Sequence, residues 1–67
     1  HEVDEMLTMQ EVADYLRKSV ATLRYWRHLA TGPRGFKVGK EVRYWKSDVI
    51  LWLLEQSEKY DRPQDPR

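Results

Sequence analysis

Residues 8–30 read TMQEVADYLRKSVATLRYWRHLA, and two helix starts lie within this stretch. Thr8 and Glu11 form a capping box, in which the Thr8 hydroxyl accepts from the Glu11 amide and the Glu11 carboxylate reaches back to Thr8. Ser19 is a second N-cap residue. The spacing therefore predicts one short helix after Thr8 and another that runs from Ser19 to about Ala30.

The apolar residues of both predicted helices recur at helical intervals. These positions are Val12, Ala13 and Leu16 in the first helix, and Leu23, Trp26 and Ala30 in the second. The other side of the second helix carries Ala21, Arg24, Tyr25 and His28, with Thr22 on its flank. Two short helices joined tightly through Arg17 and Lys18 are typical of a helix-turn-helix.

A β-hairpin is predicted next along the chain. Gly32 and Pro33 end the second helix, because both residue types interrupt regular structure. Two runs then alternate apolar with basic residues around Gly39: Phe36-Lys37-Val38 and Val42-Arg43-Tyr44-Trp45. This alternation around a glycine-bearing turn favours paired strands. One side and the tip of the hairpin are expected to carry Lys37, Lys40 and Arg43.

The remaining segments define the domain. Ser47 and Asp48 are expected to cap a third helix that runs to about Lys59. The expected fold class is mainly α with a small β-hairpin wing, in the order helix-turn-helix-hairpin-helix. Residues 1–5 are expected to be an N-terminal extension, 6–60 the winged domain, and 61–67, which are polar and hold two prolines, a disordered tail. Because the chain begins at His1, we expect it to be trimmed or tagged.

Charge is distributed unevenly, although the net charge is only +1. Residues 1–16 contain five acidic residues and no base, and residues 17–46 contain nine bases and one acid. Residues 47–67 contain five acids and three bases. A basic middle between acidic ends is typical of a face that binds a polyanion. The alternative is that these lysines and arginines are merely solvated.

Composition excludes several classes of site. The chain has no cysteine, which rules out disulfides and thiolate zinc sites. His1 and His28 do not make a metal site, and no carboxylate pair or nucleophile–base spacing stands out. We expect no catalysis, no cofactor, no metal and no small-molecule ligand. The longest apolar run, 49–54, is too short to span a bilayer, so no membrane partner and a cytoplasmic setting are expected.

Phe36, Trp45 and Trp52 allow two interpretations. They could form a platform on which the bases of a single strand stack. However, a 67-residue chain without cysteine needs large rings to close its interior, which favours placing all three in the core.

Several local strings occur in a characteristic order. They are Leu7-Thr8 with Glu11-Val12-Ala13 and Tyr15-Leu16, Ser19 with Thr22-Leu23-Arg24-Tyr25-Trp26, Gly32-Pro33 with Phe36-Lys37-Val38-Gly39 and Val42-Arg43-Tyr44, and Ser47-Asp48-Val49 with Trp52-Leu53. Over roughly residues 6–56 this combination resembles the excisionase-like branch of the MerR-type winged helix-turn-helix family. Members of that family often have glycine where this chain has Arg17. A non-glycine residue at a positive-φ turn costs about 1 kcal/mol, so the angle between the two helices is expected to differ.

The resemblance implies double-stranded DNA as the partner, with the second helix in the major groove. Arg24 and Thr22 are then expected at base edges, and Tyr25 and Arg27 at phosphate or sugar. Ser19 is expected to contact a phosphate from the helix N-terminus. Two alternatives stay open: Ser19 only caps the helix, and the stem of Arg27 only covers Trp26.

The wing is implied to lie along the adjacent minor groove or the DNA backbone. The expected contacts there are Lys37, Lys40 and Arg43, with Arg34 from the preceding loop. Because minor-groove readout is degenerate, these residues would contribute affinity and bending more than base identity. The alternative is a solvated hairpin face.

The resemblance also implies a function. The leading hypothesis is a phage-type excisionase, a recombination directionality factor in the cytoplasm or nucleoid of a bacterial host. Such a protein binds adjacent sites beside an attachment site, bends the DNA and favours the integrase complex that excises. Integrase is then a further partner. The alternatives are a short MerR-like transcriptional regulator and, from another class, a protein-interaction module whose charged face binds an acidic protein.

The third helix is predicted to have an exposed apolar side. Residues 49–54 are six consecutive apolar residues, and a domain of this size can cover only one face of a helix. Val49 and Leu53 are expected to point inward, with Trp52 beside them. Self-association on DNA is expected through the remaining three: Ile50, Leu51 and Leu54. The alternative is that the tail or an integrase covers this side.

Overall fold

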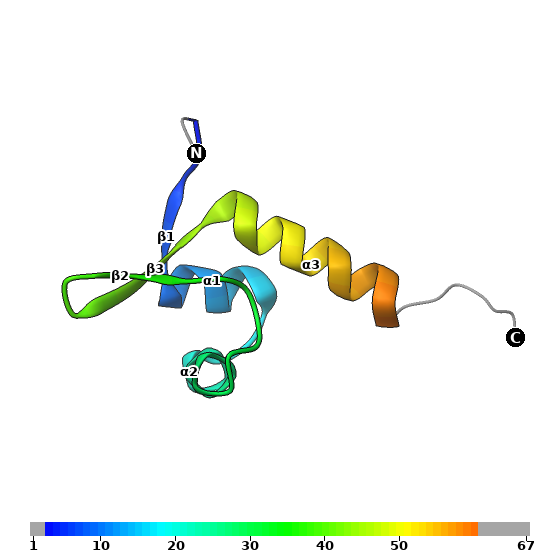
Figure 1. Cartoon of the computed structure of the whole chain (residues 1–67), viewed down its shortest axis with the longest axis horizontal. Helices are drawn as coiled ribbons and strands as arrows, with labels where there is room; N and C mark the ends of the chain where they lie inside the picture. Colours follow the sequence, from blue (N-terminus) through cyan, green and yellow to red (C-terminus); the bar gives the residue numbers. More distant parts are fainter. Residues whose placement is uncertain (1–2, 61–67) are drawn as a thin grey trace, which may run out of the picture.

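The computed structural model describes residues 3–60, and the predictions for the tail at 61–67 and for His1 lie outside them. Within the described part, three helices accompany a three-stranded antiparallel sheet (Figure 1). The elements in chain order are β1 (Met6–Thr8), α1 (Met9–Leu16), α2 (Val20–His28), β2 (Phe36–Val38), β3 (Glu41–Trp45) and α3 (Lys46–Tyr60). The expected fold class, a winged helix-turn-helix, is confirmed.

Strand β1 was not predicted. It pairs antiparallel with β3, opposing Leu7 to Tyr44, so the sheet order is β1-β3-β2. Three residues are too few to show an alternating pattern, and the partner strand lies far along the chain. The hairpin of β2 and β3 was predicted, and the turn between its strands contains Gly39 at a φ of +65°.

The predicted caps of the first two helices are confirmed. The Glu11 amide donates to the Thr8 hydroxyl at 3.1 Å, and the Thr8 amide donates to the Glu11 carboxylate at 2.8 Å. The Ser19 hydroxyl accepts from the Thr22 amide at 3.1 Å. These bonds satisfy amides that have no partner within the helix, and they place both helix starts where the sequence predicts them.

Both of these helices end at a non-glycine residue in the left-handed conformation. Arg17 has a φ of 59° and Ala30 a φ of 57°. The Thr31 amide donates to the Trp26 carbonyl at 2.8 Å and the Ala30 amide to the Arg27 carbonyl at 3.0 Å, which is a Schellman motif. The motif ends α2 at His28, two residues before the predicted end.

Replacing Ala30 with glycine is expected to stabilise the domain by about 1 kcal/mol, because glycine adopts a positive φ without steric cost. For a domain of this size the thermal midpoint should rise by about 4–8 °C. The matched control is Ala21→Gly inside α2, which should lower stability by about 1 kcal/mol. Thermal unfolding followed by circular dichroism checks both, and a fall in the Ala30→Gly midpoint would contradict the prediction.

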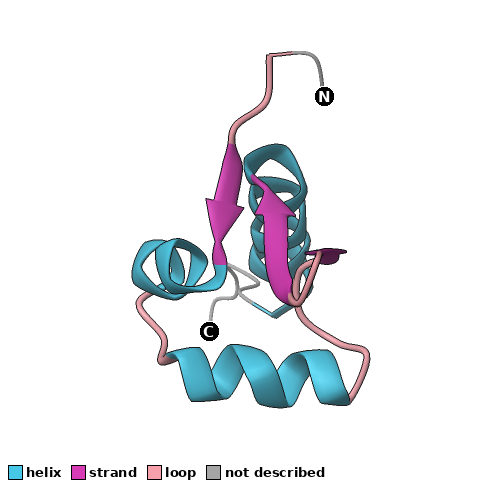
Figure 2. Ribbon diagram, turned by 90° about the vertical axis from the view of Figure 1, so that its left-hand side faces the viewer, coloured by secondary structure: helices cyan, strands magenta, loops and turns pink. Residues whose placement is uncertain are grey.

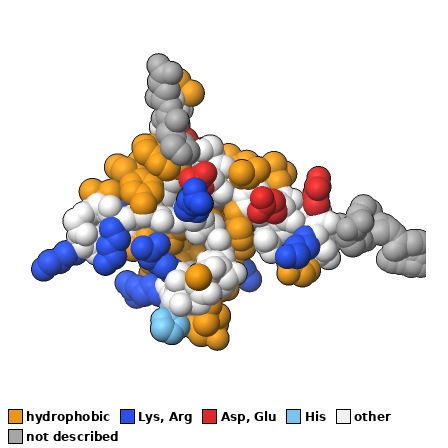
Figure 3. Space-filling view, viewed as in Figure 1, with side chains coloured by type: hydrophobic (Ala, Val, Ile, Leu, Met, Phe, Trp, Pro, Cys, Tyr) orange, Lys and Arg blue, Asp and Glu red, His pale blue; other side chains and the backbone are white. Residues whose placement is uncertain are grey.

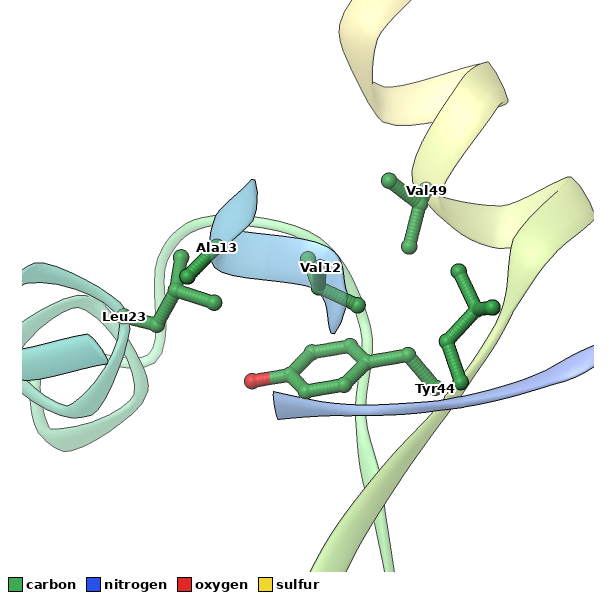
Figure 4. Packing of buried hydrophobic residues seen from close by; sticks show 6 residues of the cluster. Val12, Ala13, Leu23, Tyr44 and Val49 are labelled. Carbon is green, nitrogen blue, oxygen red and sulfur yellow. The ribbon is translucent and has the colours of Figure 1, made fainter. Parts of the chain in front are cut away.

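The core lies where both short helices, the sheet and α3 meet. Its buried residues are Leu7, Val12, Ala13, Leu23, Tyr44 and Val49. The ring of Tyr44 extends from β3 toward α2 and passes below Val12 (Figure 4). The expectation of Phe36 and Trp45 in the core was wrong: both are half-buried, and they stack at 5.5 Å on the opposite face of the sheet from Tyr44.

Helix α3 contributes one buried residue, Val49. Trp52, the third ring expected in the core, is also half-buried and lies outside the buried cluster, so that expectation was wrong too; its ring packs 5.3 Å from that of Trp26. Leu53, expected to point inward, is 40% exposed, so that expectation was wrong. The helix extends away from the rest of the domain along its longest direction, so only its first turns meet the core (Figure 1).

Ser47 and Asp48 were expected to cap α3, and this expectation was wrong. The segment before β1 holds the start of the helix instead. The Ser47 amide donates to the Asp4 carboxylate at 3.1 Å, and the Ser47 hydroxyl also donates to it. The Lys46 amide donates to the Glu5 carbonyl at 2.8 Å. Part of the predicted N-terminal extension therefore contacts the domain and caps its last helix.

Asp4→Ala is expected to destabilise the protein in a pH-dependent way. The hydrogen bond from the Ser47 side chain, with others from the Ser47 and Glu5 amides, holds the pKa of Asp4 below its usual range. A lowered pKa means that the stabilisation is present above the ordinary aspartate pKa and is lost as pH falls through the lowered one. Urea midpoints of the variant should therefore be lower at neutral pH and should converge with those of the native chain in strong acid. A constant difference across this range would contradict the prediction.

Candidate nucleic-acid interface

A hollow of about 610 Å³ separates α2 from the hairpin. Helix α2 lines one side with Arg24, Arg27 and His28, and Met9 adds to the lining from α1. The hairpin lines the other side with Lys37, Lys40, Glu41, Val42 and Arg43. Elements that are separate in sequence thus place five lysines and arginines and one glutamate around a single concave surface.

The charged side chains are distributed unevenly over the molecule. In Figure 3 most of the visible lysines and arginines gather over α2 and the hairpin, whereas the visible acidic side chains lie toward the N-terminal strand and α3, where some basic side chains also lie. The helix-turn-helix caps and the hairpin turn determine this arrangement, because they fix where each basic side chain leaves the backbone. A concave surface with an excess of positive charge focuses its field, and such a surface favours a polyanion.

The basic residues of the hairpin were expected on one side and at the tip, but they leave both faces of the sheet. Lys37 pairs with Val42, whereas Arg43 pairs with Phe36, so Lys37 and Arg43 leave opposite faces of the sheet. The Arg43 side chain, 23% exposed, forms an ion pair with Glu41 at 2.5 Å and donates to the Val42 carbonyl at 3.0 Å. Lys37 and Lys40 are exposed. Their ammonium groups are therefore less constrained than the guanidinium of Arg43, which is paired with Glu41.

On α2 the hydroxyls of Ser19 and Thr22 hydrogen-bond to each other at 2.9 Å. Ser19 is thus the N-cap of α2, which is one of the two interpretations of this residue. Thr22 is half-buried. Arg24 and Tyr25 are exposed, Tyr25 by 61%. Two residues, Arg24 and Thr22, are predicted to contact base edges. Of these, Arg24 is the one that lines the hollow.

Arg27 is exposed and borders the hollow near the edge of the core. Burial raises the pKa of Tyr44, and the charge of Arg27 opposes this shift. Arg27 also borders a second hollow of about 510 Å³, formed by residues 30–35 of the loop. Arg34 lines that second hollow and not the first, so the structure separates it from the other predicted contacts.

Sequence analysis did not assign His28, Met9 or Glu41 to the site. His28 lies one helical turn after Arg24, and this i, i+4 spacing was the signal that could have found it. Met9 and Glu41 reach the hollow only through the packing of α1 and the pairing of β3 with β2. No local pattern predicts either of them.

The described residues carry neither a metal-binding cluster nor a membrane-spanning helix. Within residues 3–60, no group of three or more histidine, cysteine, aspartate or glutamate residues is placed to hold a metal ion. Of the helices in this part of the chain, none combines the length and the apolar character needed to cross a membrane.

A family model described as a helix-turn-helix domain matches residues 6–57. This is most of the chain, and the chain therefore belongs to this helix-turn-helix DNA-binding family. No curated protein and no solved structure matches it.

Proposed function

We propose that this member of the helix-turn-helix domain family reads duplex DNA with α2 in the major groove and with the hairpin against the adjacent minor groove or backbone. The observation that carries the proposal is the basic hollow between the two elements. A recognition helix and a wing in neighbouring grooves have one sugar–phosphate strand between them. A concave surface with five cationic side chains accommodates such a strand.

The proposed roles follow from position. Arg24 reads a base edge, and Arg27, Lys37 and Lys40 bind phosphates of the strand that occupies the hollow. Arg43 supports the hairpin through Glu41 and contacts the backbone secondarily. Contacts of Ser19, Thr22 and Arg34 with DNA stay predictions. In this proposal the domain has no catalytic role, and it acts by binding and deforming DNA.

Salt dependence tests this proposal. Neutralising Z phosphates makes log affinity fall with log salt with a slope of about −0.9Z. Three phosphate contacts from Arg27, Lys37 and Lys40, with a fourth if Arg43 also takes part, should give a slope of about −3 to −4. Titration of a labelled duplex at several potassium chloride concentrations measures it. A slope near zero would contradict DNA binding through the hollow and favour the alternative, a protein-interaction module.

Among the DNA-binding functions, we propose that of an excisionase. This proposal rests on the resemblance of the sequence to the excisionase-like branch. A small domain whose wing follows a groove binds and bends DNA, and an array of such domains would shape an attachment site for integrase. Footprinting on neighbouring genomic DNA distinguishes the roles. Closely phased tandem sites favour the excisionase, whereas a single promoter operator favours a short transcriptional regulator.

We also propose that α3 mediates contact between neighbouring copies on DNA. Its exposed apolar patch consists of Ile50, Leu51 and Leu54, which are 36%, 58% and 58% exposed, and Leu53, 40% exposed, lies beside it. Such a patch covers a few hundred Å² at most. A stable interface buries about 1,200–2,000 Å² in total, so a second copy would dock weakly in solution. Adjacent DNA sites raise the effective concentration and make the contact effective.

Ile50→Glu with Leu54→Lys is expected to abolish cooperative loading of adjacent sites while single-site affinity stays unchanged. The matched control, Glu55→Lys with Lys59→Glu, exchanges two exposed charges on α3 without altering an apolar residue and should preserve cooperativity. Band-shift titrations on one-site and two-site duplexes measure both. If the native chain fills adjacent sites independently, the self-association proposal fails and the patch serves another partner, such as an integrase.

A further inference from the structure

Helix α2 presents an apolar surface at the place where its side chains would face the bases. Ala21 and Tyr25 are exposed and lie one helical turn apart, on the side opposite the buried Leu23. Figure 2 shows α2 across the bottom of the molecule, with no other described element on its outer side. Two apolar groups therefore stand beside Arg24 on the surface that enters the groove.

The hydroxyls of Ser19 and Thr22, at the start of α2, already hydrogen-bond within the helix. The Ser19 hydroxyl accepts from the Thr22 amide and hydrogen-bonds with the Thr22 hydroxyl at 2.9 Å. The first turns of the helix thus offer a groove the guanidinium of Arg24, the methyl group of Ala21 and the ring of Tyr25, whose hydroxyl is a further polar group. The combination of one guanidinium with apolar surface limits which bases α2 can recognise.

The major-groove edges of the bases carry one apolar group, the C5-methyl of thymine. An arginine prefers guanine, whose O6 and N7 accept two hydrogen bonds. We infer that Ala21 and the ring of Tyr25 form a contact for thymine methyl groups beside the base that Arg24 reads. This inference rests on the proposed function. It moves the ring of Tyr25 from the DNA backbone, where the sequence placed it, to the base edges.

The small side chain of Ala21 permits close approach near the start of the helix, and the Tyr25 ring supplies the larger apolar face. His28 and Arg24 flank this surface on the side of the hollow. The specific site should therefore contain thymine next to the guanine read by Arg24, on either strand.

Replacing thymine with deoxyuridine tests the inference, because it removes the methyl group and leaves base pairing intact. A high-affinity duplex is first selected from random sequences, and each thymine in it is then replaced singly. Affinity should fall about fourfold at one or two thymines, the factor that burial of one methyl group contributes. Tyr25→Ser should lose the sensitivity at one of these positions, and Tyr25→Phe should keep it. Tyr15→Ser, an exposed tyrosine of α1, is the control and should also keep it.

The outcomes separate the inference from the proposed function. Steep salt dependence and clear sequence preference, with no sensitivity to deoxyuridine at any position, overturn the inference and leave DNA binding intact. Equal weakening of thymine and deoxyuridine duplexes by Tyr25→Ser also overturns it, because Tyr25 would then contact the backbone. Absence of salt-dependent duplex binding overturns the proposed function as well.

Discussion

A Tyr44→Ala variant is expected to lose a large share of the stability of the domain and to unfold at a much lower urea concentration than the native chain. Truncation of a buried aromatic ring to alanine costs about 3–5 kcal/mol. A chain of this length has a total stability of roughly 3–10 kcal/mol, so the loss removes a large share of it. Tyr44 is 2% exposed and is one of the largest fully buried side chains.

The position of this ring explains why the cost should be high. It joins β3 to both short helices, and the loop before β2 packs directly on it. A Cβ atom at Gly35 would lie only 2.9 Å from the Cε2 atom of Tyr44, so the loop backbone lies directly against the ring. Removing the ring therefore leaves a cavity bordered by several elements, and collapse of one element cannot fill it.

Tyr44→Phe is the matched control, since it retains the ring and should fold. Burial raises the pKa of the Tyr44 hydroxyl. The native chain should consequently keep its stability below the ordinary tyrosine pKa and lose some as the pH rises through the raised one. The phenylalanine variant should lack this contribution to alkaline destabilisation. Urea unfolding followed by far-ultraviolet circular dichroism measures both variants, and a Tyr44→Ala midpoint near that of the native chain would contradict the prediction.

Arg24→Ala should have the second largest effect, on DNA recognition. Loss of a bidentate contact to a base costs about 1–3 kcal/mol, which is about 5- to 150-fold in affinity for the specific site. Because Arg24 is exposed and α2 is capped independently by Ser19, the variant should fold normally. Selection from random duplexes should show relaxed preference at one base position.

Lys40→Ala is the matched comparison, because Lys40 lies in the hairpin turn on the same hollow. A lost phosphate contact should weaken binding to all duplexes alike and reduce the salt slope by about one. Unchanged sequence preference in Arg24→Ala would mean that the recognition face of α2 has been assigned wrongly.

Features that depend on residues within one turn of each other were determined by the sequence. The Thr8–Glu11 capping box and the Ser19 cap each join residues three apart, so local hydrogen bonds define both helix starts. The hairpin follows from alternation around Gly39, which adopts the positive φ that the turn needs. The order of elements in the winged helix-turn-helix and the choice of Arg24 as the main candidate for base reading did not require the tertiary structure.

Features that depend on register or on distant partners required the tertiary structure. The pairing of β1 with β3 and the capping of α3 by Asp4 join segments about forty residues apart, and no local pattern encodes such contacts. Strand register placed Lys37 and Arg43 on opposite faces. A six-residue apolar run could not reveal that Leu53 would be exposed, because the run is apolar on every side and only packing chooses the buried one. The basic hollow is likewise tertiary, since its size and lining depend on how the hairpin packs beside α2.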